Sequence, residues 1–65
     1  MPSTVIKTFS YVPGEQALDV QFQTGRHYRY HDVPAEEAEA MRAAFSKGVY
    51  FNEHIRDRYR YTRTR

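Results

Sequence analysis

Residues 17–32 read ALDVQFQTGRHYRYHD, two segments of alternating side chains separated by a Thr-Gly turn signal. In both segments the apolar side chains occupy every second position, namely Leu18, Val20, Phe22, Tyr28 and Tyr30. Successive side chains of a strand lie on opposite faces of a sheet. Both segments therefore predict strands with one apolar face and one polar face.

The loop between these strands determines which residues pair. A two-residue loop would place Val20 and Phe22 opposite basic or imidazole residues of the second strand, which is unfavourable on a buried face. A three-residue loop, or a bulge near Gly25, pairs Phe22 with Tyr28 and Val20 with Tyr30 instead. We predict the second arrangement because it keeps one continuous apolar face.

Further strand and helix signals flank this hairpin. Residues 4–12 are rich in β-branched and aromatic side chains, which favours a strand before the hairpin. After the hairpin, acidic residues and an apolar stripe predict a helix from about Pro34 to Phe45. The side chains that this helix would bury are Ala38, Met41, Ala44 and Phe45. A second, shorter helix is predicted over residues 49–55.

The chain has the size of one small domain. A sequence of 65 residues buries only about 60% of the surface that its unfolded form exposes. We predict a single α+β domain over residues 1–65, of order β-β-β-α-α, in which two helices pack on one face of a three-stranded antiparallel meander. Residues 57–65 form either a short C-terminal edge strand or a basic tail.

The composition excludes several classes of site and location. The chain has no cysteine, so disulfides and thiolate metal sites are excluded, and we expect no cofactor. No apolar run approaches the roughly 18 residues of a membrane span. The first residues also lack the basic and apolar regions of a secretion signal. We expect a cytoplasmic protein without membrane contact.

Charge is distributed unevenly along the chain. Residues 1–41 contain three basic and six acidic groups, whereas residues 42–65 contain seven basic and two acidic groups. The two halves therefore carry charges of −3 and +5 within a net charge of +2. A basic segment of this kind attracts phosphate.

Arginine and tyrosine alternate in the basic half and in an earlier Tyr-Arg-Tyr tripeptide. Tyrosine rings stack on bases, and guanidinium groups bind phosphate through two hydrogen bonds. The candidate nucleic-acid-binding residues are Arg29, Lys47, Tyr50, Arg56, Arg58, Tyr59, Arg60, Tyr61 and Arg63. For Tyr28 and Tyr30 we favour a core role, because they share the phase of the apolar residues that must face the helices.

Three histidines raise the question of metal binding or catalysis. His27 and His31 are four residues apart on a predicted strand, about 13 Å, which is too far to share one ion. We therefore predict no metal site. A His-dependent ribonuclease would need two acid-base groups and a cation near one phosphate, and His54 with an arginine could contribute to such a site. Nothing in the spacing requires this arrangement, and we predict that the protein is not an enzyme.

Several motifs occur together in one order along the chain. They are Leu18-x-Val20-x-Phe22, Tyr28-x-Tyr30, Val33-Pro34 and Ser46-x-Gly48-x-Tyr50-x-Asn52-x-x-Ile55. This order resembles the KTSC domain, a family named after the C-terminus of some lysyl-tRNA synthetases that includes small bacterial proteins. The resemblance covers nearly all 65 residues and implies a domain for which RNA binding has been suggested. The arginine-rich residues 59–65 depart from the family pattern.

These observations lead to a non-catalytic nucleic-acid-binding module with RNA as the expected partner. The alternative is a small protein–protein interaction domain that docks a partner chain through a sheet edge or aromatic side chains. The two hypotheses differ in their expected salt dependence. Phosphate binding weakens steeply as salt rises, whereas an interface anchored by aromatic residues does not.

Overall fold

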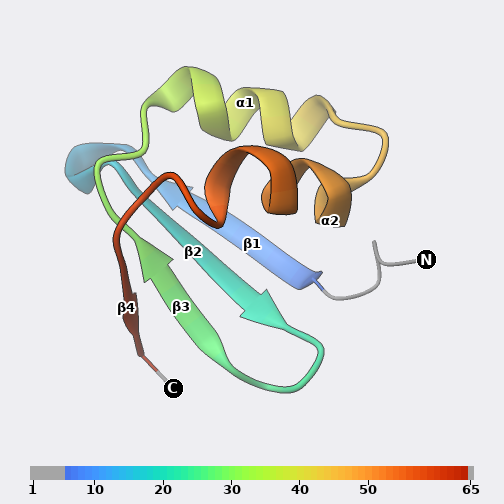
Figure 1. The fold of residues 1–65 in the computed structure, drawn as a ribbon. Coiled ribbons are helices and arrows are strands. Elements are labelled where there is room, and N and C mark those ends of the chain that lie inside the picture. The colour runs from blue at the N-terminus through green and yellow to red at the C-terminus, as the bar shows by residue number, and fades with distance from the viewer. Residues whose placement is uncertain (1–5, 65) are drawn as a thin grey trace.

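The computed structural model describes residues 6–64 and contains one sheet and a layer of helices (Figure 1). The strands are β1 (Ile6–Val12), β2 (Ala17–Phe22), β3 (His27–Tyr30) and β4 (Tyr61–Arg63). The helical segments are η2 (Pro13–Glu15), α1 (Ala35–Ala43), α2 (Lys47–Tyr50) and η3 (Phe51–Ile55). The helices α1, α2 and η3 cover one face of the sheet, and the other face is open.

All neighbouring strands of the sheet are antiparallel, in the order β1-β2-β3-β4. The predicted α+β class, with a three-stranded meander under two helices, is therefore confirmed. The chain returns after the helices and places β4 beside β3, so the segment predicted as an edge strand or a basic tail forms the edge strand. Residues 4 and 5 of the first predicted strand lie outside the described residues.

The predicted pairing of β2 with β3 is wrong by two residues. Val20 lies opposite Tyr28, and Leu18 lies opposite Tyr30. The loop has three residues, because the amide of Phe22 donates to the carbonyl of Arg26 at 2.9 Å. Phe22 and Arg26 are therefore the last pair before the loop, and every other pair is shifted by two residues relative to the prediction. A shift of two residues preserves the face of each side chain, so the apolar face remains continuous.

The loop conformation follows from its glycine. The amide of Gly25 donates to the carbonyl of Phe22 at 2.9 Å, which closes a β-turn, and Gly25 has a φ of 95°. This left-handed conformation is accessible to glycine at little cost. A turn followed by such a residue is a common three-residue hairpin connection. The rings of Phe22 and Tyr28 still meet diagonally, with centroids 5.2 Å apart and nearly perpendicular planes.

The core lies between the sheet and the helices. Its buried residues are Leu18, Val20, Tyr30, Val33, Ala38, Met41, Phe51 and Ile55. Tyr30 is 2% exposed, whereas Tyr28 is half-buried beside it, so the core role expected for these rings holds most fully for Tyr30. No polar or charged residue of residues 6–64 is buried. The domain is thus held together mainly by apolar and aromatic packing.

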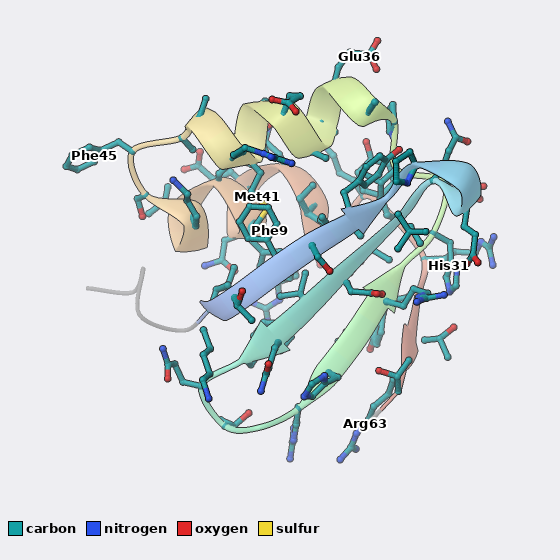
Figure 2. The ribbon with its side chains drawn as sticks, turned by 180° about the vertical axis from the view of Figure 1, so that it is seen from behind. Phe9, His31, Glu36, Met41, Phe45 and Arg63 are labelled. Carbon is teal, nitrogen blue, oxygen red and sulfur yellow. The ribbon has the colours of Figure 1, made fainter. Side chains whose placement is uncertain are left out.

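The first helix ends earlier than predicted. It stops at Ala43, and Ala44 has an extended backbone with φ of −67° and ψ of 144°. Ala38 and Met41 are buried as predicted, but Ala44 is only half-buried and Phe45 is fully exposed. Because the chain leaves the helix at Ala44, helical spacing no longer directs Phe45 toward the core. Figure 2 shows its ring projecting away from the fold.

The second helix begins two residues before its predicted start and continues from α2 into the π-helical turn η3. The hydroxyl of Ser46 accepts a hydrogen bond from the amide of Val49 at 3.3 Å and caps the helix. The amide of Arg56 donates to the carbonyl of Phe51 at 2.9 Å, five residues earlier. The resulting helix buries Phe51 and Ile55.

A hydrogen bond joins the first strand to the connection between β3 and α1. The hydroxyl of Tyr11 donates to the carbonyl of Val33 at 2.6 Å. The amide of Val33 donates in turn to the carbonyl of Gln16 at 2.9 Å. Val33 is fully buried, so the tyrosine partner satisfies a carbonyl in a segment removed from solvent.

We predict that Tyr11→Phe lowers the free energy of unfolding by about 1 to 2 kcal/mol, because it leaves the carbonyl of Val33 without this donor. Urea denaturation measures the change. Tyr61→Phe is the matched control, since it removes a hydroxyl from an exposed ring and should change stability by only a few tenths of a kcal/mol. Equal effects of the two substitutions would contradict this account.

A second prediction concerns the dependence of stability on pH. Burial raises the pKa of Tyr30 to about 12, with further contributions from Tyr61 and Tyr28. In the unfolded chain the hydroxyl of a tyrosine titrates near pH 10, so the folded state holds the proton of Tyr30 more tightly than the unfolded state does. The stabilising contribution of neutral Tyr30 is complete below about pH 10 and is lost as pH rises through about 12. Denaturation curves across this range should show a smaller loss of stability for Tyr30→Phe; an identical loss in both proteins would argue against the assignment.

Candidate nucleic-acid interface

The aromatic side chains of three adjacent strands form a column that ends at an exposed ring. The Tyr28 and Tyr61 rings are parallel within 1°, with centroids 4.9 Å apart. Tyr61 also contacts the buried ring of Tyr30 at 5.4 Å, and Phe22 contacts Tyr28 from the other side. Tyr61 is 54% exposed although it belongs to this column. The column therefore offers one fixed aromatic surface to solvent.

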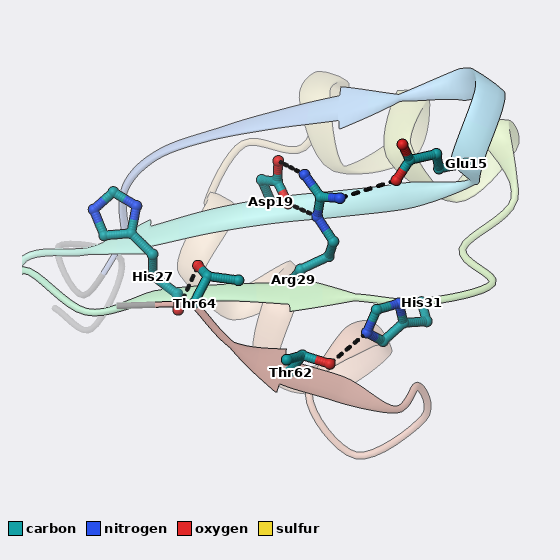
Figure 3. A network of polar contacts seen from close by, with 7 residues as sticks. All are labelled: Glu15, Asp19, His27, Arg29, His31, Thr62 and Thr64. Carbon is teal, nitrogen blue, oxygen red and sulfur yellow. Dashed lines mark hydrogen bonds and ion pairs between the residues drawn. The ribbon is translucent and has the colours of Figure 1, made fainter.

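The position of Tyr61 follows from alternation along β4 and from contacts on the open face. Thr62 points to the side opposite Tyr61, where its hydroxyl lies 2.7 Å from Nε2 of His31 (Figure 3). The hydroxyl of Thr64 donates to the carbonyl of His27 at 3.1 Å. These contacts hold β4 against β3 with its tyrosine on the helix-covered side of the sheet.

Three arginines occur near Tyr61 in the C-terminal part of the chain. Arg63 is two residues beyond Tyr61 on β4 and shares its face by alternation. The guanidinium of Arg56 donates to the amide oxygen of Asn52 at 3.3 Å, and its positive charge opposes the upward shift in the pKa of Tyr30. Arg60 pairs with Asp32 at 3.1 Å, and both side chains are more than three-quarters exposed. Exposed pairs of this kind contribute about 0.2 to 1 kcal/mol and exchange readily with other anions.

We define the β4 surface as Arg56, Arg60, Tyr61 and Arg63. Of these four candidate residues, Tyr61 and Arg63 lie on the edge strand β4, Arg60 directly precedes it, and Arg56 follows the end of η3. In Figure 2 the side chain of Arg63 extends into solvent at the end of this edge. The surface combines a fixed ring with exposed cationic groups, which is suited to a ligand that is both planar and anionic.

Arg29 lies apart from the β4 surface, on the open face of the sheet. Its Nε and Nη2 donate to the two carboxylate oxygens of Asp19 at 2.7 and 3.0 Å, and its Nη1 donates to Glu15 at 2.9 Å (Figure 3). The hydrogen bond and charge of Asp19 raise the pKa of Arg29 further. Two carboxylates around one guanidinium leave a net negative charge, so we exclude Arg29 from the candidate interface.

Four other candidates lie with the helices. Nζ of Lys47 donates to the carbonyl of Ala44 at 2.8 Å, and Figure 1 shows the start of α2 on the side of the molecule opposite β4. The hydroxyl of Tyr50 donates to Glu37 at 3.0 Å. Tyr59 is half-buried against the core, and Arg58 is exposed close to Tyr50 and Tyr59.

Burial is the largest cause of raised pKa values in Tyr50 and Tyr59. For Tyr50, the hydrogen bond to Glu37 raises the pKa further, since a nearby carboxylate disfavours a phenolate. The ring of Tyr50 is also stacked on His54, with centroids 4.3 Å apart. Tyr50 and Tyr59 thus make structural contacts that leave Tyr61 as the more accessible ring.

The histidines do not converge on one point. His27 and His31 lie on the open face of the sheet, whereas His54 stacks on Tyr50 in the helical layer. A shallow hollow of about 340 Å³ on the open face includes His27 and the Asp19–Arg29 pair in its lining. Within residues 6–64 no group of three or more His, Asp or Glu side chains could hold a metal ion. In the same part of the chain, no helix has the length and apolar character to cross a membrane.

The sequence did not predict two features of the structure, the aromatic stack at β4 and the hollow on the open face. The stack of Tyr61 on Tyr28 depends on the register of β4 against β3, for which the repeated Tyr-Arg-Tyr was the only local signal. The hollow on the open face involves β1, β2, β3 and Thr64, and no single segment encodes it.

Comparisons with known proteins give both complete and partial relatives. A protein from Stutzerimonas stutzeri is 38% identical over 64 residues, which cover 97% of this chain and 90% of that protein. A lysine–tRNA ligase from Nostoc punctiforme is 38% identical over 58 residues, which cover 89% of this chain but only 10% of the ligase. The sequence therefore corresponds to a nearly complete small protein in one case and to a minor segment of a large enzyme in the other.

The fold and the sequence point to the same family. The crystal structure of a KTSC domain protein from Yersinia pestis superposes with a TM-score of 0.86 at 28% identity, covering 89% of this chain and 82% of that one. The family model of the KTSC domain matches residues 2–59 and ends before β4. The chain therefore belongs to the KTSC domain family.

Proposed function

We propose that this domain is a non-catalytic nucleic-acid-binding module that binds RNA through the β4 surface. The observation that carries this proposal is the exposed ring of Tyr61, held parallel to Tyr28 in an arginine-rich part of the chain. A ring that is fixed before binding loses little conformational entropy when a ligand stacks on it. The adjacent guanidinium groups supply the charge that phosphate requires.

The distribution of charge supports the same surface. The open face of the sheet carries its main guanidinium between two carboxylates, and the exposed residues of α1 include Glu36 and Glu39. The arginines after residue 55 provide the contrasting positive region. An anionic chain would approach this end of the molecule in preference to the others.

The partial relatives add a reason to favour RNA. The Nostoc punctiforme protein with a similar segment is by name a lysine–tRNA ligase, whose substrate is an RNA. A small domain beside such an enzyme would serve by increasing the contact with that RNA. Within the β4 surface, however, Arg60, Tyr61 and Arg63 lie beyond the residues matched by the family model, so in this chain the proposal rests on the geometry of β4.

One observation favours the alternative of a protein-interaction domain. Phe45 is fully exposed and Val49 is 41% exposed at the corner between the two helices (Figure 2). An exposed aromatic side chain of this kind can anchor a protein partner. Binding at this corner would be less sensitive to salt than binding at the β4 surface and would be lost in Phe45→Ser.

We predict that Arg56→Ala and Arg63→Ala each weaken the binding of a labelled short single-stranded RNA several-fold. Each should also reduce the slope of log affinity against log salt by about one, because each removes one phosphate contact. Fluorescence anisotropy at several salt concentrations gives both quantities. Arg42→Ala is the matched control: it removes the same charge from an exposed position on α1 and should leave the slope unchanged.

Similar losses in all three variants would mean that RNA responds only to net charge and would contradict a defined β4 surface.

The proposal also predicts that the domain does not cleave RNA. Labelled RNA incubated with the domain in the absence of added metal should remain intact, because the imidazole groups do not converge on one phosphate position. Gel electrophoresis of the RNA tests this. Cleavage that disappears in His54→Ala would instead support the ribonuclease alternative.

A further inference from the structure

The main chain of β4 presents hydrogen-bonding groups at the open edge of the sheet. The amide of His31 donates to the carbonyl of Arg60 at 2.9 Å, and the amide of Thr64 donates to the carbonyl of His27 at 2.7 Å. In an antiparallel pair, residues whose main chain faces the partner alternate with residues whose main chain faces away. Because Arg60 and Thr64 face β3, the main-chain amide and carbonyl of Tyr61 point away from it.

These two groups lie beside the exposed ring. In the sheet formed by residues 6–64, β4 is the outer strand, so the amide and carbonyl of Tyr61 point to the side without a further strand. One face of the Tyr61 ring is covered by Tyr28 at 4.9 Å, and Tyr61 is nevertheless 54% exposed to solvent. A ring face, a donor and an acceptor therefore occur together at one residue.

We propose that Tyr61 is the binding site for one unpaired base of a single-stranded RNA. This inference rests on the proposed function and specifies the ligand of the same surface. The base stacks on the outer face of Tyr61 as the next ring of the column, and its polar edge bonds to the main-chain amide and carbonyl of that residue. A base within a duplex is stacked on both faces and cannot enter this position.

Recognition at this site is tolerant of sequence. Every base has an aromatic face, so stacking does not distinguish strongly among them. Every base also has a donor and an acceptor on its pairing edge, and the main chain of Tyr61 offers one partner for each. The β4 surface contains one tyrosine, so each domain holds one base while Arg63, two residues further along β4, contacts a flanking phosphate.

The experiment compares a short single-stranded RNA with the same strand annealed to its complement, by fluorescence anisotropy at low salt. We expect the single strand to bind about tenfold more tightly than the duplex. Tyr61→Phe should bind more tightly than Tyr61→Ala, because it retains the ring. Tyr61→Ala should bind about tenfold more weakly, since stacking contributes about 1 to 3 kcal/mol per base. The salt slope should not change in Tyr61→Ala, because no charge is removed.

An NMR titration of the wild-type protein tests the site without any substitution. The amide of Tyr61 should shift strongly on addition of the single strand. Thr62→Val is a control on the opposite side of β4 and should preserve the affinity. Circular dichroism of each variant checks that the fold is retained.

The outcomes separate this inference from the proposed function. Equal affinity for single strand and duplex, with no effect of Tyr61→Ala but a reduced salt slope in Arg63→Ala, would overturn the base site and leave charge-driven RNA binding intact. Absence of binding to either form at low salt would overturn both. Selective binding of the single strand with the expected effects at Tyr61 would support both.

Discussion

Burial of Tyr30 is the interaction on which the rest of the structure depends. Its ring meets Phe51 of the helical layer edge-on at 5.4 Å and Tyr61 of β4 at the same distance, and on the sheet it lies opposite Leu18. One side chain thus joins the meander, the helices and the added strand. In a small domain each large aromatic ring supplies a substantial share of the buried surface, so few other residues could replace this contact.

The same strand that buries Tyr30 also determines where charge is available. Alternation turns Arg29 to the open face, where Asp19 and Glu15 surround it, while Thr62 and His31 join the strands beside it. On the open face the positive charge of Arg29 is therefore neutralised by neighbouring carboxylates. The exposed arginines of the C-terminal part lie where the chain has few acidic residues, namely Arg56, Arg58, Arg60 and Arg63.

The sequence predicted the faces of the strands, the class of fold and the two helices, because period-2 and helical apolar spacing are local signals. It did not predict the pairing of Val20 with Tyr28, since the two registers differ by two residues and bury the same face. It placed Phe45 in the core because the spacing continued past Ala43, although the helix ends there to reach its Ser46-capped successor. The candidate site was predicted as a set of residue types; the selection of Tyr61 required the pairing of β4 with β3, which joins residues 31 to 35 positions apart.

All three residues of β4 are exposed, so this strand can change in sequence more easily than the core can. Substitutions at solvent-facing positions of an outer strand perturb stability little, whereas those in the core are costly. The family model matches residues 2–59, so the strand that carries the exposed ring lies outside the matched part. This short terminal segment can therefore accept changes of side chain while the packing of the scaffold beneath it stays the same.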